Sequence, residues 1–191
     1  MARVQWKPGT LLYPVPVVLV SCGDYQGSSN LLTVAWAGTV SSDPVRVSVS
    51  IRPERYSYSL IKANGELVIN LPSRKMVRAV DLCGVKSGRE IDKFKIAGLN
   101  KEPAGLVRPP LVQEAPLALE CKVDSISHLG SHDLFIAKVV AVQVDETLID
   151  RNGRLNLAKA DLITYVHGHY WTLGQEIGSF GYSVRKKRPK R

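Results

Sequence analysis

Long apolar runs and cysteine pairs are both absent from this chain of 191 residues. The longest uninterrupted apolar stretch covers residues 15–20 and contains Pro16, whereas a bilayer-spanning helix needs about 20 apolar residues. The opening MARVQWKPGT has no apolar segment followed by a small-residue cleavage site. The sequence therefore predicts neither a membrane helix nor a secretory leader, and we expect a cytoplasmic protein without membrane partners.

The three cysteines, Cys22, Cys83 and Cys121, are odd in number, far apart and outside any CxxC pair. This spacing is typical of neither a disulfide framework nor a zinc site, so we expect reduced thiols. His167 and His169 would put two imidazoles on one face of a strand, but no neighbouring cysteine or carboxylate completes a ligand set. We expect no bound metal.

Acidic residues are missing from the last eight positions, VRKKRPKR, which hold six of the 26 basic residues. The rest of the chain keeps 20 basic against 17 acidic residues, so its net charge is +3 and not the +9 of the whole chain. We expect residues 1–183 to form one domain and residues 184–191 to form a basic, disordered tail. Binding of RNA or anionic lipid by the tail is the lesser alternative.

Strand signals dominate the remaining sequence. VRVSVSI at 45–51 alternates apolar and polar residues, which is typical of a strand with one buried face. Further strands are predicted at 15–22, 30–37, 66–70, 118–127 and 133–145, the last two joined by SHLGSH as a hairpin. Helices are predicted at 53–63, 73–83 and 90–97. Many strands without βαβ alternation predict a mainly β fold, a closed or split β-barrel.

The segment TVAWAGTVSSDP at 33–44 follows an apolar strand with small and hydroxyl residues. If the strand loosens at 38–42, backbone N–H and C=O groups beside Trp36 leave the sheet and need other partners. The edge of a planar heterocycle would supply them, with an aromatic side chain covering its apolar part. The alternative is an edge strand that ends in a polar turn, with Trp36 in the core.

A candidate phosphate site follows in SIRPERYSYSLI, residues 50–61. Arg52, Arg55 and Ser57 would surround a helix N-terminus, where free amides, guanidinium groups and a hydroxyl favour an anion. Lys93 in KSGREIDKF would add an ammonium from a short helix. Alternatively, the two arginines are solvated surface charges and Lys93 pairs with a neighbouring acid at the surface.

Several motifs occur in one order along the chain. They are NLLTVAWAGTVSSDP (30–44), RYSY (55–58), ELVINLP (66–72), DLCG, SG and DKF within 81–94, LEC (119–121) and SHDLF (131–135). Together they resemble the flavin reductase-like, flavoredoxin-type proteins of the FMN-binding split barrel, over roughly residues 10–182.

The resemblance implies a homodimer of split barrels that binds FMN without a covalent bond near the subunit interface. The positions that match cofactor ligands of the family are Asn30, Trp36, Ala37, Gly38, Thr39, Ser50, Arg52, Arg55, Ser57, Lys93, His132 and Tyr170. The phosphate would lie at Arg55, Ser57 and Lys93. The ring would lie along Asn30, Trp36 and the backbone of residues 37–39, followed by Ser50 and Arg52 on the next strand. His132 would lie near the flavin, and Tyr170 would close the site. No side chain is expected to be catalytic, because the flavin carries the chemistry.

The resemblance leaves two functions open. The first is an oxidoreductase that passes hydride from NADH or NADPH to the flavin; the absence of a GxGxxG fingerprint does not count against it. The second is a flavoredoxin-type electron carrier that a protein partner reduces. A nucleic-acid-binding barrel that uses the basic tail is the weaker third alternative.

Overall fold

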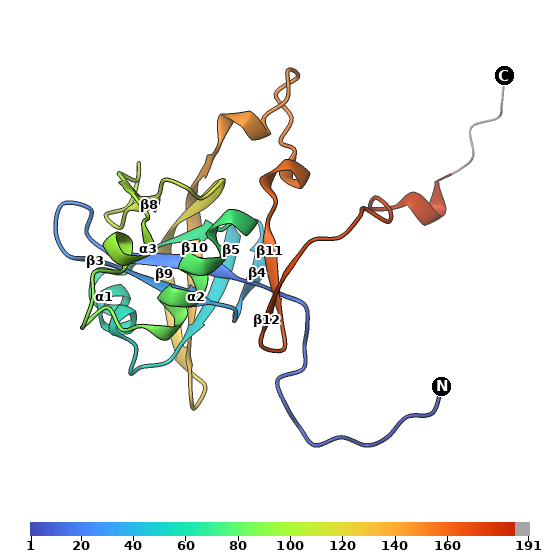
Figure 1. Ribbon diagram of the computed structural model, residues 1–191, viewed down its shortest axis with the longest axis horizontal. Helices are drawn as coiled ribbons and strands as arrows, with labels where there is room; N and C mark the ends of the chain where they lie inside the picture. Colours follow the sequence, from blue (N-terminus) through green and yellow to red (C-terminus); the bar gives the residue numbers. More distant parts are fainter. Residues whose placement is uncertain (186–191) are drawn as a thin grey trace.

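The computed structural model describes residues 1–185 and has at its centre a curled, seven-stranded antiparallel sheet (Figure 1). Its strand order is β3-β2-β6-β9-β10-β5-β4. The strands are β2 (Val18–Gly23), β3 (Ser29–Val34), β4 (Ala37–Ser42), β5 (Val45–Ile51), β6 (Glu66–Leu71), β9 (Leu117–His128) and β10 (Asp133–Val144). The sheet curls until β3 lies near β5, without a ladder between them. The predicted mainly β, split-barrel fold is confirmed.

Smaller elements cover this barrel. A three-stranded sheet consists of β1 (Val15–Pro16), β11 (Ile163–Val166) and β12 (His169–Thr172), and a two-stranded one of β7 (Lys101–Glu102) and β8 (Leu111–Val112). The α-helices are α1 (Tyr56–Asn64), α2 (Val77–Val85) and α3 (Lys93–Ala97). The 3₁₀ turns are η1 (Arg74–Met76), η2 (Glu146–Leu148), η3 (Leu157–Ala160) and η4 (Tyr182–Val184). Helices α2 and α3 pack against β3.

Of three apolar clusters in the described residues, the two larger ones hold the layers around the site together. Inside the barrel, Phe135, Leu67 and Val49 are buried from three different strands. A second core lies between the barrel and helices α2 and α3, around Val80 and Phe94. Burying a side chain of this size contributes about 1.5–3 kcal/mol. The outer surface of β3 therefore stays fixed beneath the two helices.

The strand predictions differ from the structure at two places. The predicted strand 15–22 divides into β1 and β2, which belong to different sheets. The predicted loosening at 38–42 is wrong for most of the segment, because these residues form β4 and pair with β5 except at a bulge at Val40. The strand breaks earlier, at Ala35 and Trp36, where the Trp36 carbonyl accepts a hydrogen bond of 2.8 Å from Ser50 N. Trp36 is half-buried beside this break and is not a core residue.

The helix predictions are correct in number and wrong at their ends. Helix α1 begins at Tyr56 and not at 53, because Arg55 at its N-cap keeps an extended backbone. Helix α2 continues past Gly84, where the sequence predicts its end. A Cβ on Gly84 would lie 3.3 Å from Thr33 Cβ, so this glycine allows the helix to approach β3. Helix α3 begins after Asp92, whose side chain accepts from Lys95 N.

Other predictions concern the cysteines, the histidine pair and the ends of the chain. All three cysteines are buried and free, as expected. His167 does not share a strand with His169, because His167 and Gly168 form the β11–β12 turn with positive φ. Residues 186–191, most of the predicted tail, lie outside the described residues. Within residues 1–185, no helix has the length and apolar character needed to span a membrane.

Candidate functional site: three adjoining cavities

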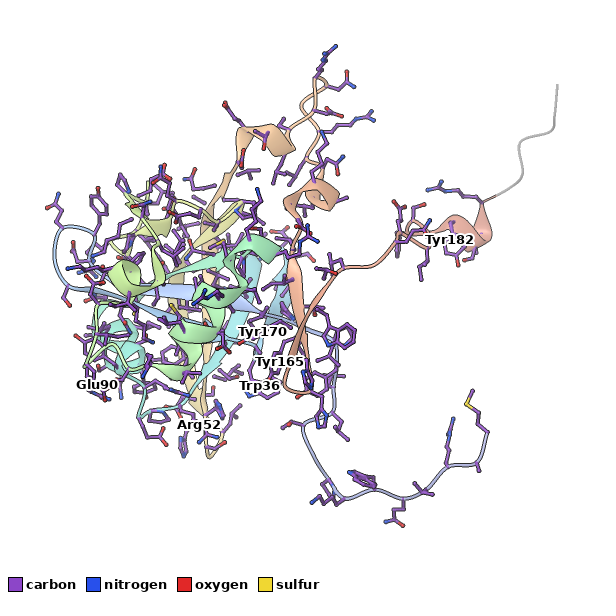
Figure 2. All side chains as sticks on the ribbon, in the orientation of Figure 1. Trp36, Arg52, Glu90, Tyr165, Tyr170 and Tyr182 are labelled. Carbon is purple, nitrogen blue, oxygen red and sulfur yellow. The ribbon has the colours of Figure 1, made fainter. Side chains whose placement is uncertain are left out.

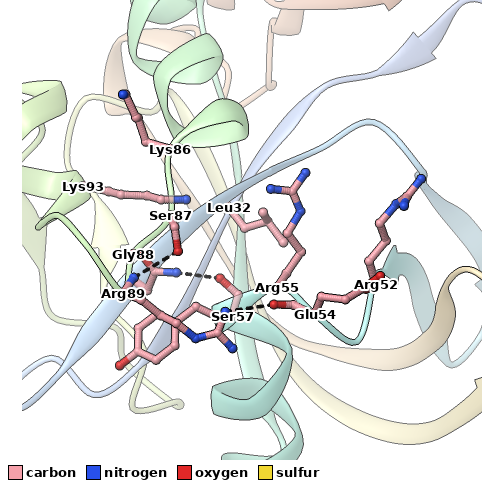
Figure 3. Close-up of a pocket in the computed structure, with 12 residues that line it drawn as sticks. Leu32, Arg52, Glu54, Arg55, Ser57, Lys86, Ser87, Gly88, Arg89 and Lys93 are labelled. Atoms are coloured by element: carbon pink, nitrogen blue, oxygen red, sulfur yellow. Dashed lines mark hydrogen bonds between the residues drawn. The ribbon is translucent and has the colours of Figure 1, made fainter.

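The first cavity, of about 390 Å³, lies between the β5–α1 connection and the loop that precedes α3 (Figure 3). It is lined by Asn30, Leu32, Arg52, Glu54, Arg55, Tyr56, Ser57, Lys86, Ser87, Gly88, Arg89 and Lys93. Five of these side chains are cationic and one is anionic. In Figure 3, Lys93 and Arg55 extend toward the cavity from opposite sides, while Lys86 points away from it. Such a wall favours an anion.

Lys93 is the most unusual group of this cavity, because its ammonium is buried without a carboxylate. Its Nζ donates to the carbonyls of Leu31 at 2.8 Å and Cys83 at 2.7 Å, and one N–H remains for a third partner. No acidic side chain within residues 1–185 forms a salt bridge with it. Burial lowers the pKa of Lys93, and the Arg55 charge acts in the same direction. An anion in the cavity would stabilise this ammonium.

A polar pair fixes the floor of the first cavity. Asn30 Nδ2 donates to Ser57 Oγ at 2.8 Å, and both side chains are buried. Ser57 accepts this bond, so its own hydroxyl hydrogen remains for another partner. Gly88 lies directly against the pair, since a Cβ there would come within 2.1 Å of Asn30 Oδ1. The chain thus uses a glycine to bring a backbone turn onto a buried amide.

The mouth of the first cavity combines a helix N-terminus with two arginines. Arg55 is the N-cap of α1, without a side-chain capping bond and without an acid in the first turn. The first-turn amides of α1 therefore present donors and a partial positive charge. Within the described residues, the side chains of Arg52 and Arg55 form no hydrogen bond and no salt bridge. Both guanidinium groups are available to a ligand.

A second cavity, of about 410 Å³, adjoins the first and shares Leu32, Arg52 and Arg55 with it. Its walls include the aromatic side chains of Trp36, Tyr165 and Tyr170, which Figure 2 labels beside α2. Ala35, Ser50, Asp81, Gly84, Val85, His132 and Gly168 also line it. Aromatic faces next to backbone groups suit a flat, partly polar ring.

Tyr170 connects the β11–β12 hairpin to α2 across the second cavity. Its hydroxyl donates to Asp81 Oδ1 at 3.1 Å, and its ring lies edge-on to Tyr165 with centroids 5.7 Å apart. Burial, followed by the hydrogen bond to Asp81, raises the pKa of Tyr170 to about 12. The hydroxyl therefore stays protonated at neutral pH and holds the hairpin against the helix.

His132 reaches the second cavity from the β9–β10 turn. Burial lowers its pKa, and the positive charge of Arg52 adds to this effect, so the neutral imidazole is favoured. The turn itself is anchored by the buried Asp133, whose Oδ2 accepts from Tyr58 Oη at 2.7 Å. Oδ1 of Asp133 lies 2.6 Å from His128 Nδ1 on the opposing strand. These bonds fix the position of the neighbouring His132.

The structure brings most of the predicted site residues together. The first cavity contains Asn30, Arg52, Arg55, Ser57 and Lys93, and the second contains Trp36, Ser50, Arg52, Arg55, His132 and Tyr170. Ala37 and Gly38 line a third cavity that adjoins the second. Thr39 lines none of the three, because it lies farther along β4, opposite Val47. The surface alternative for Lys93 is wrong, since this side chain is buried.

Sequence reasoning missed several lining residues. Ser87, Gly88 and Arg89 lie in the same KSGREIDKF stretch as Lys93, and the glycine among polar residues was the available signal. Arg89 donates from Nη1 to the Glu54 carbonyl at 3.0 Å and so connects the two sides of the cavity. Asp81 and Tyr165 gave no signal, because only the tertiary fold brings them to the second cavity.

Comparisons with known proteins agree with this geometry. The sequence model of the flavin reductase like domain matches residues 10–174. An uncharacterised Pyrococcus abyssi protein is 36% identical over 147 residues, covering 77% of this chain and 83% of that protein. Flavoredoxin of Desulfovibrio vulgaris (Miyazaki F) superposes with a TM-score of 0.87 at 32% identity, covering 96% of this chain and 100% of that one.

A Thermus thermophilus FMN-binding protein with bound 1-cyclohex-2-enone superposes with a TM-score of 0.76 at 26% identity, covering 93% of this chain and 99% of that one. The sequence match spans both the barrel and the β11–β12 hairpin, and the superpositions cover nearly the whole chain. This chain therefore belongs to the flavin reductase-like domain family.

Proposed function

We propose that this protein binds FMN without a covalent bond and is a flavin-dependent oxidoreductase. The observation that carries the proposal is the buried ammonium of Lys93, which has no carboxylate partner and faces the same cavity as Arg55. FMN presents one dianionic phosphate and one flat ring. The first cavity matches the phosphate in charge, and the adjoining second cavity matches the ring in shape and aromatic lining.

Each group has a separate task in this proposal. Lys93, Ser57, Arg55 and the first-turn amides of α1 would bind the phosphate. Trp36, Tyr170 and Ser50 would surround the ring, and neutral His132 would donate or accept one hydrogen bond at its edge. Bound FMN would supply the hydride and electron chemistry. The side chains of this chain bind the cofactor and position it, and none is assigned as an acid or base.

The electron donor divides the proposal into two forms. In the first, NADH or NADPH reduces the flavin, and the protein is a flavin reductase. In the second, a protein partner supplies the electrons, and the protein is an electron carrier. The similarity to a flavoredoxin, with a TM-score of 0.87, is the reason to test the electron-carrier form as well as the reductase form. Three buried, free cysteines support a reducing, cytoplasmic location for either form.

The first test is the absorption spectrum of the purified protein, followed by mass identification of any ligand released on denaturation. Flavin bands and the mass of FMN are expected. The matched variants are Arg55→Gln, which removes a cavity charge, and Arg151→Gln, which removes an exposed charge that lines none of the three cavities. Arg55→Gln should weaken FMN binding about tenfold or more, and Arg151→Gln should not change it. A protein that binds no added FMN contradicts the proposal.

Stopped-flow mixing of the FMN-loaded protein with NADH or NADPH separates the two forms. Rapid loss of the oxidised flavin absorbance supports the reductase. Flavin that keeps its absorbance under both nucleotides, yet bleaches with dithionite, supports the carrier. The two nucleotides are compared at equal concentration so that any preference is measured in the same experiment.

The proposal includes a homodimer. Residues 1–12 and the segment after β12 leave the barrel on the same side (Figure 1). They carry exposed apolar side chains, among them Trp6, Leu12, Ile177 and Phe180. Exposed apolar segments of this size favour burial against another surface. Sedimentation velocity should give a dimer near 42 kDa, about twice the chain mass of 21.0 kDa. A monomer at micromolar concentration would contradict this part of the proposal.

A further inference from the structure

A groove of about 610 Å³ runs along the outer face of α2 and reaches the second cavity. We call it the α2 groove; its walls are Val77, Arg78, Asp81, Leu82, Val85, Lys86 and Tyr170. Asp81, Val85 and Tyr170 also line the second cavity, so the groove begins where the proposed ring site ends. A molecule bound in the α2 groove would therefore lie next to the ring.

The floor of the α2 groove is apolar and open. Val85, the last residue of α2, is 70% exposed, although the opposite face of the helix packs against β3. Val77 and Leu82 are half-buried beside it. The lining comes only from α2, Lys86 and Tyr170, so no other element of the described residues forms a wall over this floor. An open apolar surface with a polar rim is typical of an interaction surface.

Two cations without acidic partners flank this floor. Arg78 and Lys86 are eight positions apart, which corresponds to about 12 Å along a helix axis. Neither side chain forms a salt bridge within residues 1–185. Lys86 points away from the first cavity in Figure 3, so the proposed phosphate site does not use its charge. Asp81, the one acid of the groove, accepts the hydrogen bond from the Tyr170 hydroxyl.

The net positive charge of the domain is concentrated in this part of the chain. Residues 74–86, which comprise η1, α2 and Lys86, contain four basic residues and one acidic residue, a net charge of +3. Residues 1–183 contain 20 basic and 17 acidic residues, so the remainder has 16 of each and no net charge. Arg74 is paired with Asp161 at 3.0 Å, but Lys75, Arg78 and Lys86 form no salt bridge in the described chain. A local positive field of this kind attracts an acidic partner and orients its approach.

We infer that the α2 groove is the docking surface for an acidic redox protein that supplies electrons to the bound flavin. The inference rests on the proposed function for the flavin itself. Two molecules of a one-electron donor would each lose one electron, and FMN would gain both electrons and a proton from the solvent. Weak electron-transfer interfaces bury less than about 1,200 Å², so an exposed helix face with its rim is large enough.

The groove suits a protein better than the phosphates of a dinucleotide. The two phosphates of a dinucleotide are adjacent, whereas the backbones of Arg78 and Lys86 are about 12 Å apart, with apolar side chains between them. A protein surface can place separate carboxylates at both cations and an apolar side chain on the floor between them. A dinucleotide, an anionic lipid surface and a second copy of this chain are therefore outcomes of the test.

The binding test titrates the ¹⁵N-labelled full chain with oxidised plant-type [2Fe–2S] ferredoxin, a small acidic protein. Amide signals of residues 74–86 should change first, and the change should disappear as the ionic strength rises to about 0.5 M. Arg78→Glu reverses a groove charge. Arg151→Glu makes the same change in net charge at an exposed position outside the groove and the three cavities.

Arg78→Glu should weaken ferredoxin binding about fivefold or more, and Arg151→Glu should leave it within about twofold. If the two variants have equal effects, the protein responds to net charge alone, and the inference is wrong. Signal changes that leave out residues 74–86 also overturn it.

Stopped-flow reduction of the FMN-loaded protein supplies a second readout. Reduced ferredoxin is compared with the methyl viologen radical cation, a small donor that needs no docking surface. Arg78→Glu should lower the rate with ferredoxin about fivefold or more and leave the rate with methyl viologen within about twofold. A decrease by the same factor with both donors would mean that Arg78 affects the flavin and not the docking, and would overturn the inference.

Further measurements separate this inference from the proposed function and from other occupants. FMN affinity is measured first and should be unchanged in Arg78→Glu, because Arg78 lines none of the three cavities. A chain that never binds FMN contradicts the proposed function, while ferredoxin binding is still measured on that chain. With ferredoxin binding unchanged, three other effects of Arg78→Glu overturn the inference. Slower reduction by NADPH would assign the groove to a dinucleotide, weaker binding to phosphatidylglycerol vesicles to a lipid surface, and dissociation of a dimer to a second copy.

Discussion

The two ends of the proposed FMN site are built differently. The first cavity is formed by elements packed on the barrel, and its groups are fixed by buried hydrogen bonds such as Asn30 to Ser57 and Lys93 to two carbonyls. The second cavity has one wall from the β11–β12 hairpin, which belongs to a separate sheet. That wall depends on aromatic packing and on the bond from Tyr170 to Asp81.

Because of this difference, we expect the two ends to recognise a ligand in different ways. The cationic end is preorganised and should bind the phosphate. Removing a cationic side chain should therefore lower the affinity for FMN and leave the affinity for riboflavin, which has no phosphate, nearly unchanged. The aromatic end should bind the ring, so removing an aromatic side chain should lower the affinities for FMN and riboflavin by the same factor. The ratio of FMN affinity to riboflavin affinity is therefore the quantity that tests the comparison.

The largest effect is expected for Gly88→Ala. The added Cβ would lie 2.1 Å from Asn30 Oδ1, and the buried bond of Asn30 to Ser57 leaves the amide little room to move. FMN affinity should fall 100-fold or more, with a lower unfolding temperature in a thermal melt. Gly174→Ala is the control, because a Cβ there meets nothing within 4 Å. The double variant Gly88→Ala with Asn30→Ala should regain thermal stability, and a melt as low as that of Gly88→Ala alone would contradict the steric cause.

Lys93→Met should have the next largest effect and the greatest selectivity. Loss of the ammonium removes a charge-assisted bond to phosphate, so FMN affinity should fall about tenfold or more while riboflavin affinity changes little. The Leu31 and Cys83 carbonyls lose their donor, which should lower the free energy of unfolding by about 1–3 kcal/mol. Fluorescence titration with both flavins, together with urea unfolding, measures the two effects. If Lys93→Met lowers the affinities for FMN and riboflavin by the same factor, Lys93 does not bind the phosphate.

Tyr170→Ala should weaken FMN and riboflavin by the same factor, about three- to tenfold, because one aromatic wall of the second cavity is removed. The affinity ratio should stay that of the unmodified protein in the same fluorescence titration. Tyr182→Ala is the matched control, since Tyr182 is exposed and lines none of the three cavities. A change in the ratio would show that the two ends are not independent.

Asp133→Asn should have the smallest effect, which is confined to the pH dependence of the free energy of unfolding. The hydrogen bond from Tyr58, with a further one from His128, holds the pKa of Asp133 below its ordinary 3.8. Its stabilising contribution is therefore present above about pH 3.8 and is lost as the pH falls through the lower folded value. Urea unfolding between pH 3 and pH 7 should show a shallower acid loss in Asp133→Asn. Identical slopes in both proteins would exclude Asp133 as a source of acid sensitivity.

Sequence patterns predicted much of this architecture. The alternation in VRVSVSI identified β5 with its bounds, and SHLGSH identified the β9–β10 turn that carries His132. The order of motifs identified the family, and eleven of the twelve predicted site residues line one of the three cavities. These features could be predicted because each depends on residues that are close in sequence, or on motifs that keep their order along the chain.

Other features could not be predicted from local sequence. Gly84 is a typical helix-ending residue, yet α2 continues through it, and the absence of a side chain there lets the helix pack closely against Thr33 on β3. The residues 38–42 have the composition of a polar loop, yet pairing with β5 makes them a strand. In both cases a partner distant in sequence, or across a strand pair, decides the conformation against local propensity.

The strand pattern, the family and the types of residue at the proposed site follow from the amino-acid sequence. Which of those residues come into contact depends on the packing of the folded chain. Lys93 is an ordinary lysine in the sequence, and it becomes a buried ammonium without a carboxylate because α3 packs against β3 and α2. Burial and the proximity of distant segments are properties of packing, and a one-dimensional pattern does not contain the distances on which charge and desolvation depend.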